Sequence, residues 1–587
     1  MSQPTTHDWK PARNSKNQGM PAEDNPEKDT IIKDAVASRG ESDDGQEDEL
    51  APHLHTKTFL AVFSVCLIYF AQDFALVGAG AQGQIISRHF GRPGDTVWIT
   101  APITIFTVVL GPIVSQAADY WGRKWFLVVL SLFGGIGCLI VACAISMNMI
   151  IAGSCIIGVG FGAQPLLHTV ASEVLPRRWR AWAQSAVMVS NGLGLLVGLL
   201  AGGAFNRHGN PNGFRYHFYI AMAFFVLASV ICIFVYQPRQ TDLQMALSFK
   251  EKASQLDWVG YILLASSLVL FCMGLFWSQN PYAWSDAHPS APFAVGLALA
   301  SVLIFYEAKF KKDGMFHHGL FKVNWNFTIS IICVFCEGMA FFAATIYFPF
   351  QVSVLYETDF LMVSVRFSIA YITTLAASLF TGLYCDMTKK VRWVTFTAFV
   401  IFVAFFICMA TTNKDSSLSV WGYPVLMGWA LGMTLVTLIT AAQLSIRAEL
   451  ISIASGLIIS VRSLGATIGI AIYNSVFISA TQRLEGNVSK AIAAAGLPQT
   501  SIEKFVADLL AQNTSSLSQV FGVNQDIIQA GLGALKDTYS AGFRNVWCTA
   551  AAFTVLALVA SVFLFDPSKE FNNHIDAPVE KEEDLFS

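Results

Sequence analysis

Three ionisable residues lie deep inside long apolar stretches of the sequence. Asp73, Glu337 and Arg462 each fall within an apolar run that is long enough to form a helix. A charge in such surroundings is costly unless it is paired, hydrogen-bonded or turned toward a water-filled cavity. A carboxyl group held there can take up and release a proton, and an arginine beside it can supply a counter-charge. These residue types therefore indicate either proton transfer or a static buried ion pair.

The runs that carry these residues belong to a set of fourteen, which predicts an all-α integral membrane protein. A bilayer core of about 30 Å is crossed by a helix of about 20 apolar residues. The runs lack the period-2 alternation of a membrane β-barrel. Gln164 next to Pro165, and Gly428 with Gly432, predict bends in the fourth and twelfth spans. The fourteen predicted spans are 58–82, 97–118, 125–146, 149–169, 182–205, 216–236, 258–278, 291–307, 325–349, 361–384, 391–411, 418–442, 451–480 and 543–565.

The composition agrees with a chain that is solvated mainly by lipid. Hydrophobic residues make up 54% of the 587 residues and charged residues only 13%, whereas soluble domains carry about 25% charge. Residues 1–57 alone hold 19 of the 77 charged side chains. These values exclude a soluble enzyme, a fully disordered chain, and a nucleic-acid-binding protein that works through a basic surface.

Motifs for cofactors, metals and nucleotide hydrolysis are absent from the sequence. There is no P-loop, zinc-protease or Rossmann glycine motif, so we expect neither enzyme activity, direct ATP hydrolysis nor a cofactor. Cys333 and Cys336 form a C-x-x-C spacing inside an apolar run with no histidine nearby. We interpret this pair as packing residues rather than a metal or redox site.

The distribution of basic residues predicts the orientation in the membrane. With the N-terminus in the cytoplasm, the inner loops hold most of the loop lysines and arginines, as the positive-inside rule requires. These include Arg123, Lys124, Arg177, Arg178, Arg180, Lys389 and Lys390. The acidic segment 1–57 and the C-terminal segment 567–587 are then cytoplasmic tails, and we expect both to be disordered. The long loop 481–541 lies outside, where its N-x-S sequons at Asn487 and Asn513 predict glycosylation.

An internal repeat is indicated by two unrelated features that share one offset of 267 residues. The matching pairs are Asp119 with Asp386, Gly198 with Gly465, and Gly202 with Gly469. This register predicts two six-helix halves, 58–236 and 325–566, with two further spans inserted in 237–324. Parallel halves of this kind are typical of transporters whose substrate site lies near the bilayer midplane between them.

The loop after the second predicted span resembles a signature of the major facilitator superfamily. The family pattern is G-x-x-x-D-x-x-G-R-R/K, with Ser115 here in the place of the first glycine. The residues that match it are Asp119, Gly122, Arg123 and Lys124. The resemblance covers 58–566 and implies an inner gating motif, to which Asp386 in the second half also belongs. Asp119 is expected to pair with basic groups of the other half or to cap a helix.

Further segments resemble the fourteen-span fungal branch that contains trichothecene-type efflux pumps and siderophore transporters. They include Ser172–Arg180, Gly213–Arg215 and Arg462–Tyr473. The resemblance implies proton-coupled export of an amphipathic secondary metabolite or toxin by a glycoprotein of the plasma membrane, with a vacuolar or vesicle membrane as the alternative location. Proton-driven uptake of an iron–siderophore complex is the main alternative function. A transceptor or structural membrane protein that no longer transports is the third.

The same resemblance assigns roles to the deep residues. The first helices of the two halves line the central cavity in this superfamily, so Asp73 and Glu337 are expected to face it and one of them to carry the coupling proton. Arg462 would tune Glu337 as its counter-charge. The weaker candidates for substrate contact are Gln72, Gln164 and Trp429. The expected partners are a small-molecule substrate, protons and the lipid bilayer, but no nucleic acid, and we expect a monomer.

The predicted orientation can be tested by proteolysis. If loop 481–541 is extracellular, trypsin added to intact cells should cut it while the chain remains in the membrane. Detection of the short C-terminal fragment with an antibody against a C-terminal tag would measure this cleavage. Full protection of the loop in intact cells, with cleavage only after permeabilisation, would contradict the orientation.

Overall fold

The computed structural model describes a chain that consists almost entirely of helices. It describes residues 54, 56–207, 210, 212–238, 244–245, 248–278, 282–310, 319–322, 325–510, 517 and 519–578. Fourteen helical segments are long and apolar enough to cross a membrane, and no strand occurs among the described residues. The prediction of an all-α membrane protein with fourteen spans is therefore confirmed.

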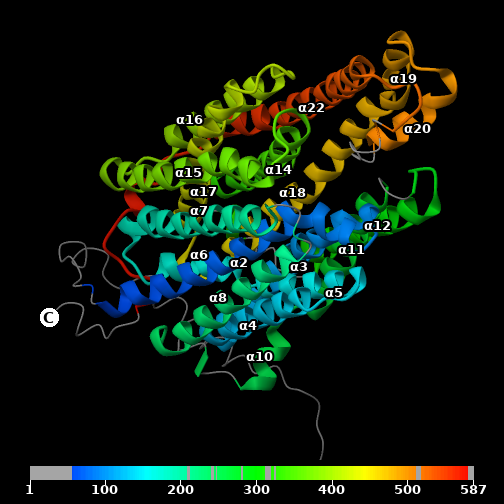
Figure 1. Cartoon of the computed structure of the whole chain (residues 1–587). Coiled ribbons are helices and arrows are strands. Elements are labelled where there is room, and N and C mark those ends of the chain that lie inside the picture. Colours follow the sequence, from blue (N-terminus) through cyan, green and yellow to red (C-terminus); the bar gives the residue numbers. More distant parts are fainter. Residues whose placement is uncertain are drawn as a thin grey trace, which may run out of the picture. The chain divides into compact units, whose positions relative to one another are not determined.

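The membrane helices follow the predicted spans closely (Figure 1). Their bounds are α2 Thr56–His89, α3 Ala101–Trp121, α4 Arg123–Ala142, α5 Met147–Phe161 with α6 Gln164–Glu173, α7 Arg180–Phe205, α8 Gly213–Val235, α11 Trp258–Trp277, α12 Ala287–Lys309, α14 Asn326–Leu355, α15 Phe360–Thr388, α16 Arg392–Ala410, α17 Pro424–Leu444, α18 Ile451–Thr481 and α22 Gln525–Ser561. Four shorter α-helices are α10 Phe249–Gln255, α13 Gly319–Lys322, α19 Leu484–Ala494 and α20 Gln499–Leu510.

The sequence predicted bends in two membrane helices, the fourth span and the twelfth. The fourth span is divided into α5 and α6 next to Pro165, which lacks the N–H that a continuous helix needs. The predicted bend at that position is confirmed. The bend predicted at Gly428 and Gly432 stays a prediction, because α17 runs as one helix from Pro424 to Leu444 and a helix can bend without being interrupted. Those two glycines allow the backbone of α15 to approach closely.

One pattern of helix contacts occurs twice along the chain. In the first part, α2 packs against α7 and α8, and α4 packs against α5 and α8. In the second part, α14 packs against α18 and α22, and α16 packs against α17 and α22. The two sets contact each other mainly through α7 with α15 and through α3 with α18. Helices α11 and α12 pack on each other, and α11 also contacts α3 and α18.

Glycines set the distance between several of these helices. A Cβ atom added at Gly198 would lie 2.9 Å from the carbonyl oxygen of Phe74 on α2. A Cβ atom at Gly465 would overlap the carbonyl oxygen of Phe335 on α14. Small residues at such places let two helix backbones approach in lipid, where no hydrophobic effect drives them together. Both members of this predicted repeat pair therefore serve the same kind of helix contact.

The long loop near the end of the chain folds into a small structure of its own. Helices α19 and α20 pack with the first turns of α22 around a separate apolar cluster. Its buried members include Leu484, Val488, Ile492, Phe505 and Ile527. Because these turns belong to α22, the last membrane helix begins at Gln525 rather than near the predicted residue 543.

The C-terminal segment departs from the expectation of a disordered tail. Residues 566–578 lie against the helix ends and make hydrogen bonds to Glu173, Arg177, Arg178, Arg180 and Lys389. The expectation is therefore wrong for these residues. The acidic and polar composition of the segment suggested solvation, but its carboxylates pair with Arg177 and the buried Arg180 of a distant loop.

The glycine contacts predict a selective loss of stability. Gly465→Ala should lower the stability of the folded chain by about 1–3 kcal/mol, because the added methyl group forces α14 and α18 apart. Gly80→Ala is the matched control, since its Cβ would meet only the side chain of Thr100 at 4.0 Å. Thermal unfolding of the detergent-solubilised protein would measure both variants. Equal melting temperatures for the two variants would contradict the proposed role of Gly465.

Candidate functional site

The two deep residues Glu337 and Arg462 form an ion pair between α14 and α18. The Nε and Nη2 atoms of Arg462 donate to the two carboxylate oxygens of Glu337 over 2.7 and 3.1 Å. The guanidinium also lies over the ring of Phe341, 4.8 Å from its centroid. Glu337 is fully buried. Two parallel charge-assisted bonds neutralise both groups and hold the two helices in one register.

Asp73 is also buried, but its hydrogen-bond partner is an amide and not a cation. Its Oδ2 atom accepts a hydrogen bond of 2.6 Å from the side-chain amide of Asn191 on α7. In the described part of the chain this carboxyl group has no ion-pair partner, and only 2% of the residue is exposed. An amide supplies a hydrogen bond but no charge, so Asp73 differs from Glu337 in lacking a neutralising cation.

Tyr69 lies on the same helix as Asp73, one turn earlier. Helix α2 contacts α6 and α14, and α6 contacts α18. The hydroxyl group of Tyr69 accepts a hydrogen bond of 3.1 Å from Gln164 on α6. Helices α2, α6, α14 and α18 carry Tyr69, Asp73, Gln164, Glu337 and Arg462, which we call the deep cluster.

The weaker candidates divide between the deep cluster and ordinary packing. Gln164 belongs to the cluster, and Gln72 lies beside Asp73 and donates to the carbonyl oxygen of Gly160 over 3.1 Å. Trp429 instead packs its ring edge-on against Phe380 of α15, with ring centroids 5.8 Å apart. The structure therefore does not bring Trp429 together with the charged residues.

The gating motif forms a compact charged group where α3 ends and α4 begins. Gly122 connects the two helices with φ = 90°, a conformation that favours glycine. Arg123 donates to Asp119 over 3.1 Å and pairs with Glu173 at the end of α6. Ser452 at the start of α18 lies with its hydroxyl beside Asp119. The expected pairing of Asp119 with a cation of the other half is therefore replaced by a cation of its own motif.

The remaining motif residues have separate surroundings. Lys124 lies over the ring of Trp125 at 5.9 Å. Asp386 at the end of α15 accepts a hydrogen bond of 3.3 Å from the indole nitrogen of Trp182 on α7. The helix ends that carry Arg123, Arg180 and Asp386 meet at one side of the helices, which we call the basic face.

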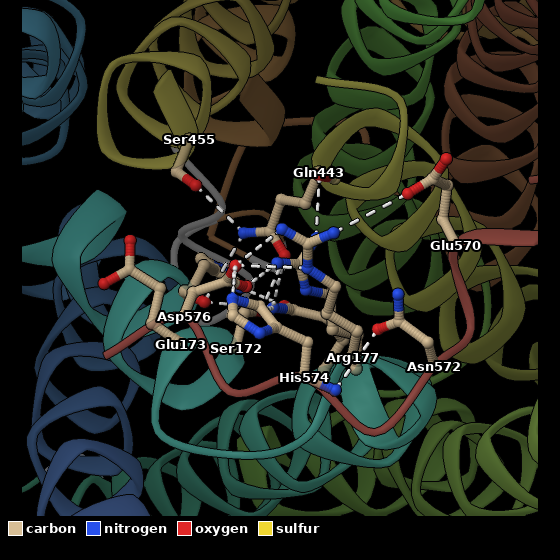
Figure 2. A network of polar contacts seen from close by, with 12 residues as sticks. Ser172, Glu173, Arg177, Gln443, Ser455, Glu570, Asn572, His574 and Asp576 are labelled. Carbon is tan, nitrogen blue, oxygen red and sulfur yellow. Dashed lines mark hydrogen bonds and ion pairs between the residues drawn. The ribbon is translucent and has the colours of Figure 1, made fainter. Parts of the chain in front are cut away.

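A buried chain of amides and hydroxyls crosses the basic face, and sequence reasoning did not find it. Gln184 of α7 donates to Ser172 over 2.6 Å, and Ser172 donates to Gln443 of α17, also over 2.6 Å. Gln443 in turn donates to Ser455 of α18 over 2.9 Å, as Figure 2 shows. We call these four residues the gate network. Each is a single polar residue near the end of a helix, so only its buried partners reveal the connection.

The sequons also have different surroundings. Asn487 lies on α19 with an exposed side chain whose amide donates to Thr538 over 3.2 Å. Asn513 falls outside the described residues. A third sequon begins at Asn326, which is only 1% exposed and bonds to Ser445 and Phe565. Of the two predicted glycosylation sites, only Asn487 can therefore be placed on a described surface.

Comparison with known proteins agrees with this architecture. Residues 58–470 match the family model described as Major Facilitator Superfamily. The chain is 22% identical over 498 residues to the trichothecene efflux pump TRI12 of Fusarium sporotrichioides, a match that covers 82% of this chain and 80% of the relative. It is 24% identical over 541 residues to the MFS-type transporter prx5 of Penicillium rubens, covering 90% and 94%.

A solved structure shares the fold at low sequence identity. The human organic anion transporter MFSD10 superposes with a TM-score of 0.52 and 12% identity, covering 86% of this chain and all of that one. The family resemblance that the loop after α3 indicated is thereby confirmed, together with the relationship to fungal efflux pumps. With a family model that matches most of its length, this chain belongs to the Major Facilitator Superfamily.

Proposed function

We propose that the chain is a proton-coupled transporter that exports an amphipathic small molecule by alternating access. Two curated relatives are named as a trichothecene efflux pump and an efflux pump of Fusarium, which favours export over siderophore uptake. The repeated helix contacts support two halves, 58–236 and 325–566, with α11 and α12 inserted between them. Rocking of these halves would open first one side of the deep cluster and then the other.

The observation that carries the proposal is the contrast between the two deep carboxyl groups. Glu337 is neutralised by Arg462 through two hydrogen bonds, whereas among the described residues Asp73 is bonded by the amide of Asn191 alone. A buried carboxylate without a cation is costly, so a proton is the available means of neutralising Asp73. We therefore assign the coupling proton to Asp73 and a fixed counter-charge role to the Glu337–Arg462 pair.

Arg462 can also respond to the charge of Asp73. Arg462 lies on α18 of the second half, and Asp73 lies on α2 of the first half. When Asp73 loses its proton, its charge attracts Arg462 across the boundary between the halves. Protonation removes that attraction. The proton thus changes the force between the halves, which is the differential interaction that coupling requires.

The substrate is expected to bind beside these groups. Gln164 donates a hydrogen bond to Tyr69, and the ring of Phe341 lies against Arg462, so this region offers both polar groups and apolar contact. Gln72 lies next to Asp73 on α2. Ligand sites are commonly apolar with a few polar groups that fix orientation. An amphipathic molecule with oxygen-containing groups fits this chemistry.

The basic face is proposed to lie in the cytoplasm. Arg123, Arg177, Arg180 and Lys389 gather there, in agreement with the positive-inside rule. The loop with α19 and α20 is then extracellular, where Asn487 is available for glycosylation. A plasma-membrane location and a monomeric state complete the proposal.

Asp73→Asn should separate transport from the proton gradient. The amide resembles the protonated carboxyl group in size but cannot release a proton. In inside-out vesicles with an acidic lumen, wild-type protein should accumulate a radiolabelled trichothecene, while Asp73→Asn should fall to the level without a gradient. Exchange of labelled for unlabelled probe should remain within about twofold of wild type, because binding and rocking need no net proton transfer.

The control for this experiment is Asp415→Asn, an equally conservative change at an exposed loop residue, which should leave accumulation unchanged. Gradient-driven accumulation by Asp73→Asn with the pH dependence of wild type would refute the assignment. Accumulation of a labelled ferric siderophore by right-side-out vesicles, but of no trichothecene by inside-out vesicles, would favour uptake instead of export.

Glu337→Gln should have a different effect, because it leaves Arg462 buried without its counter-charge. Removing one partner of a buried pair costs about 3–5 kcal/mol, so we expect reduced stability and loss of both accumulation and exchange. Melting temperature and exchange rate would be measured on the same preparation. A Glu337→Gln protein that exchanges normally but loses only its pH dependence would move the coupling proton from Asp73 to Glu337.

A further inference from the structure

The C-terminal segment 566–578 runs from the second half of the chain to the first, across the basic face. Helix α22 ends at Ser561, and the segment begins at Asp566, whose Oδ1 atom accepts hydrogen bonds of 2.8 and 2.9 Å from the backbone N–H groups of Val391 and Arg392 at the start of α16. Ser568 adds a bond to the carbonyl oxygen of Lys389. The beginning of this segment, which we call the strap, is therefore fixed to the second half.

The far end of the strap is fixed to the first half. The backbone N–H groups of Arg177 and Arg178 donate to the carbonyl oxygens of His574 and Asn572 over 2.9 and 2.8 Å. Beyond these pairs, the N–H of Ala577 donates to the carbonyl oxygen of Glu173. Figure 2 shows the strap following the loop between α6 and α7, with Asn572, His574 and Asp576 beside Arg177.

An aromatic anchor holds the middle of the strap between the halves. Phe571 is only 4% exposed and belongs to a cluster with Ala181 of α7 and residues of α15, α16 and α17. The members from the second half are Ala377, Cys385, Val391, Val394, Ala398, Met433, Ala441 and Leu444. Separation of the helix ends at this face would expose the ring of Phe571 to water, which the hydrophobic effect opposes.

Asp576 connects the strap to the gate network. Its carboxylate accepts hydrogen bonds from Arg177 at 2.8 Å and from Arg180. Arg180 is 1% exposed, and its Nη1 atom donates to the backbone carbonyl oxygen of Gln443 on α17 over 2.8 Å. One arginine of the first half is thus bound to a helix end of the second half and to the strap at once.

The two arginines keep the carboxyl group of Asp576 negatively charged. Burial raises the pKa of Asp576, but Arg180 and Arg177 lower it by more, so that the pKa lies below the usual range for aspartate. The carboxylate is therefore ionised at neutral pH. Its ion pairs are present above the ordinary carboxyl pKa and are lost only as the pH falls below the lowered value.

We propose that the strap is an internal lock on the basic face, in which Asp576 positions Arg180 against α17 and so favours the state in which this face is closed. The proposal rests on the alternating-access function proposed above. Opening of the basic face requires α7 to move from α17, which breaks the bond between Arg180 and Gln443. Without Asp576, Arg180 would lose its counter-charge.

The test measures how often the basic face opens. Ala181→Cys places a thiol at a fully buried position between the halves. In inside-out vesicles, a membrane-impermeant maleimide should label this thiol slowly, as measured by mass spectrometry of its peptide. Adding Asp576→Asn should raise the labelling rate about tenfold, as expected when hydrogen bonds to a charged group are lost. Removal of residues 567–587 should raise it at least as much.

Matched variants separate a lock from a general loss of stability. Lys569→Ala changes an exposed side chain of the same segment and should leave labelling unchanged, while Asp576→Glu should restore it toward the slow rate. Ser364→Cys reports the opposite end of the contact between α7 and α15, where Gly203 touches Ser364. Its labelling in right-side-out vesicles should not rise when Asp576→Asn is added.

The outcomes decide the proposal without reference to substrate. Unchanged labelling of the thiol at position 181 in both Asp576→Asn and the truncated chain would overturn it, as would a rise at position 364 as large as that at position 181. The labelling needs neither substrate nor a proton gradient. A failure of the coupling role of Asp73 would therefore leave this test intact, and a failure of the lock would leave the coupling test intact.

Discussion

Neutralisation of charge away from water is the constraint on which this structure depends. Inside the membrane, a charged side chain is in contact with neither water nor counter-ions, so each buried charge needs a partner within the protein. Glu337 and Arg462 do so across α14 and α18, Arg123 bonds to both Asp119 and Glu173, and Arg180 bonds to Asp576. Each of these pairs joins elements that are separate in the sequence or holds a helix end in place. The ionic contacts therefore define much of the register between the helices.

Asp73 differs from these groups because its partner is an amide. Because an amide carries no charge, only a proton can neutralise the carboxylate of Asp73. A proton-coupled transporter needs a group with this property. The same difference explains why conservative substitutions of the two deep carboxyl groups should have unlike consequences. Loss of the carboxyl group at 337 leaves a cation behind, whereas loss at 73 leaves an amide beside an amide.

In the proposed mechanism, the basic face and the deep cluster would act on the same movement from different places. The gate network and the strap connect α6 and α7 to α17 and α18 near the helix ends, while the deep cluster connects α2 and α6 with α14 and α18 farther along the helices. Because packed helices move as rigid units, contacts at the ends and in the middle bias one equilibrium. The strap adds to this system from outside the membrane helices.

Much of the fold could be predicted from the sequence, since twenty apolar residues in lipid have few alternatives to a helix. The number of spans, the break beside Pro165 and the glycine contacts at positions 198 and 465 follow from local chemistry and from the repeat. The family and the depth of Asp73, Glu337 and Arg462 were also evident in the sequence. The pairing of Arg462 with Glu337 was also expected, but the amide of Asn191 as the partner of Asp73 was not, because a change of one turn in helix register alters the partner.

The remaining features arise only when distant segments meet. In the sequence, Gln184 and Gln443 do not differ from other glutamines; only the structure shows that they bond to each other between the halves. Trp429 was a candidate for substrate contact, but the structure shows its ring packed against Phe380. The strap is the clearest case. Its composition predicts a solvated tail, and only the tertiary structure brings Asp576 to Arg177 and Arg180, where pairing with buried cations outweighs the tendency of a polar segment to remain in water.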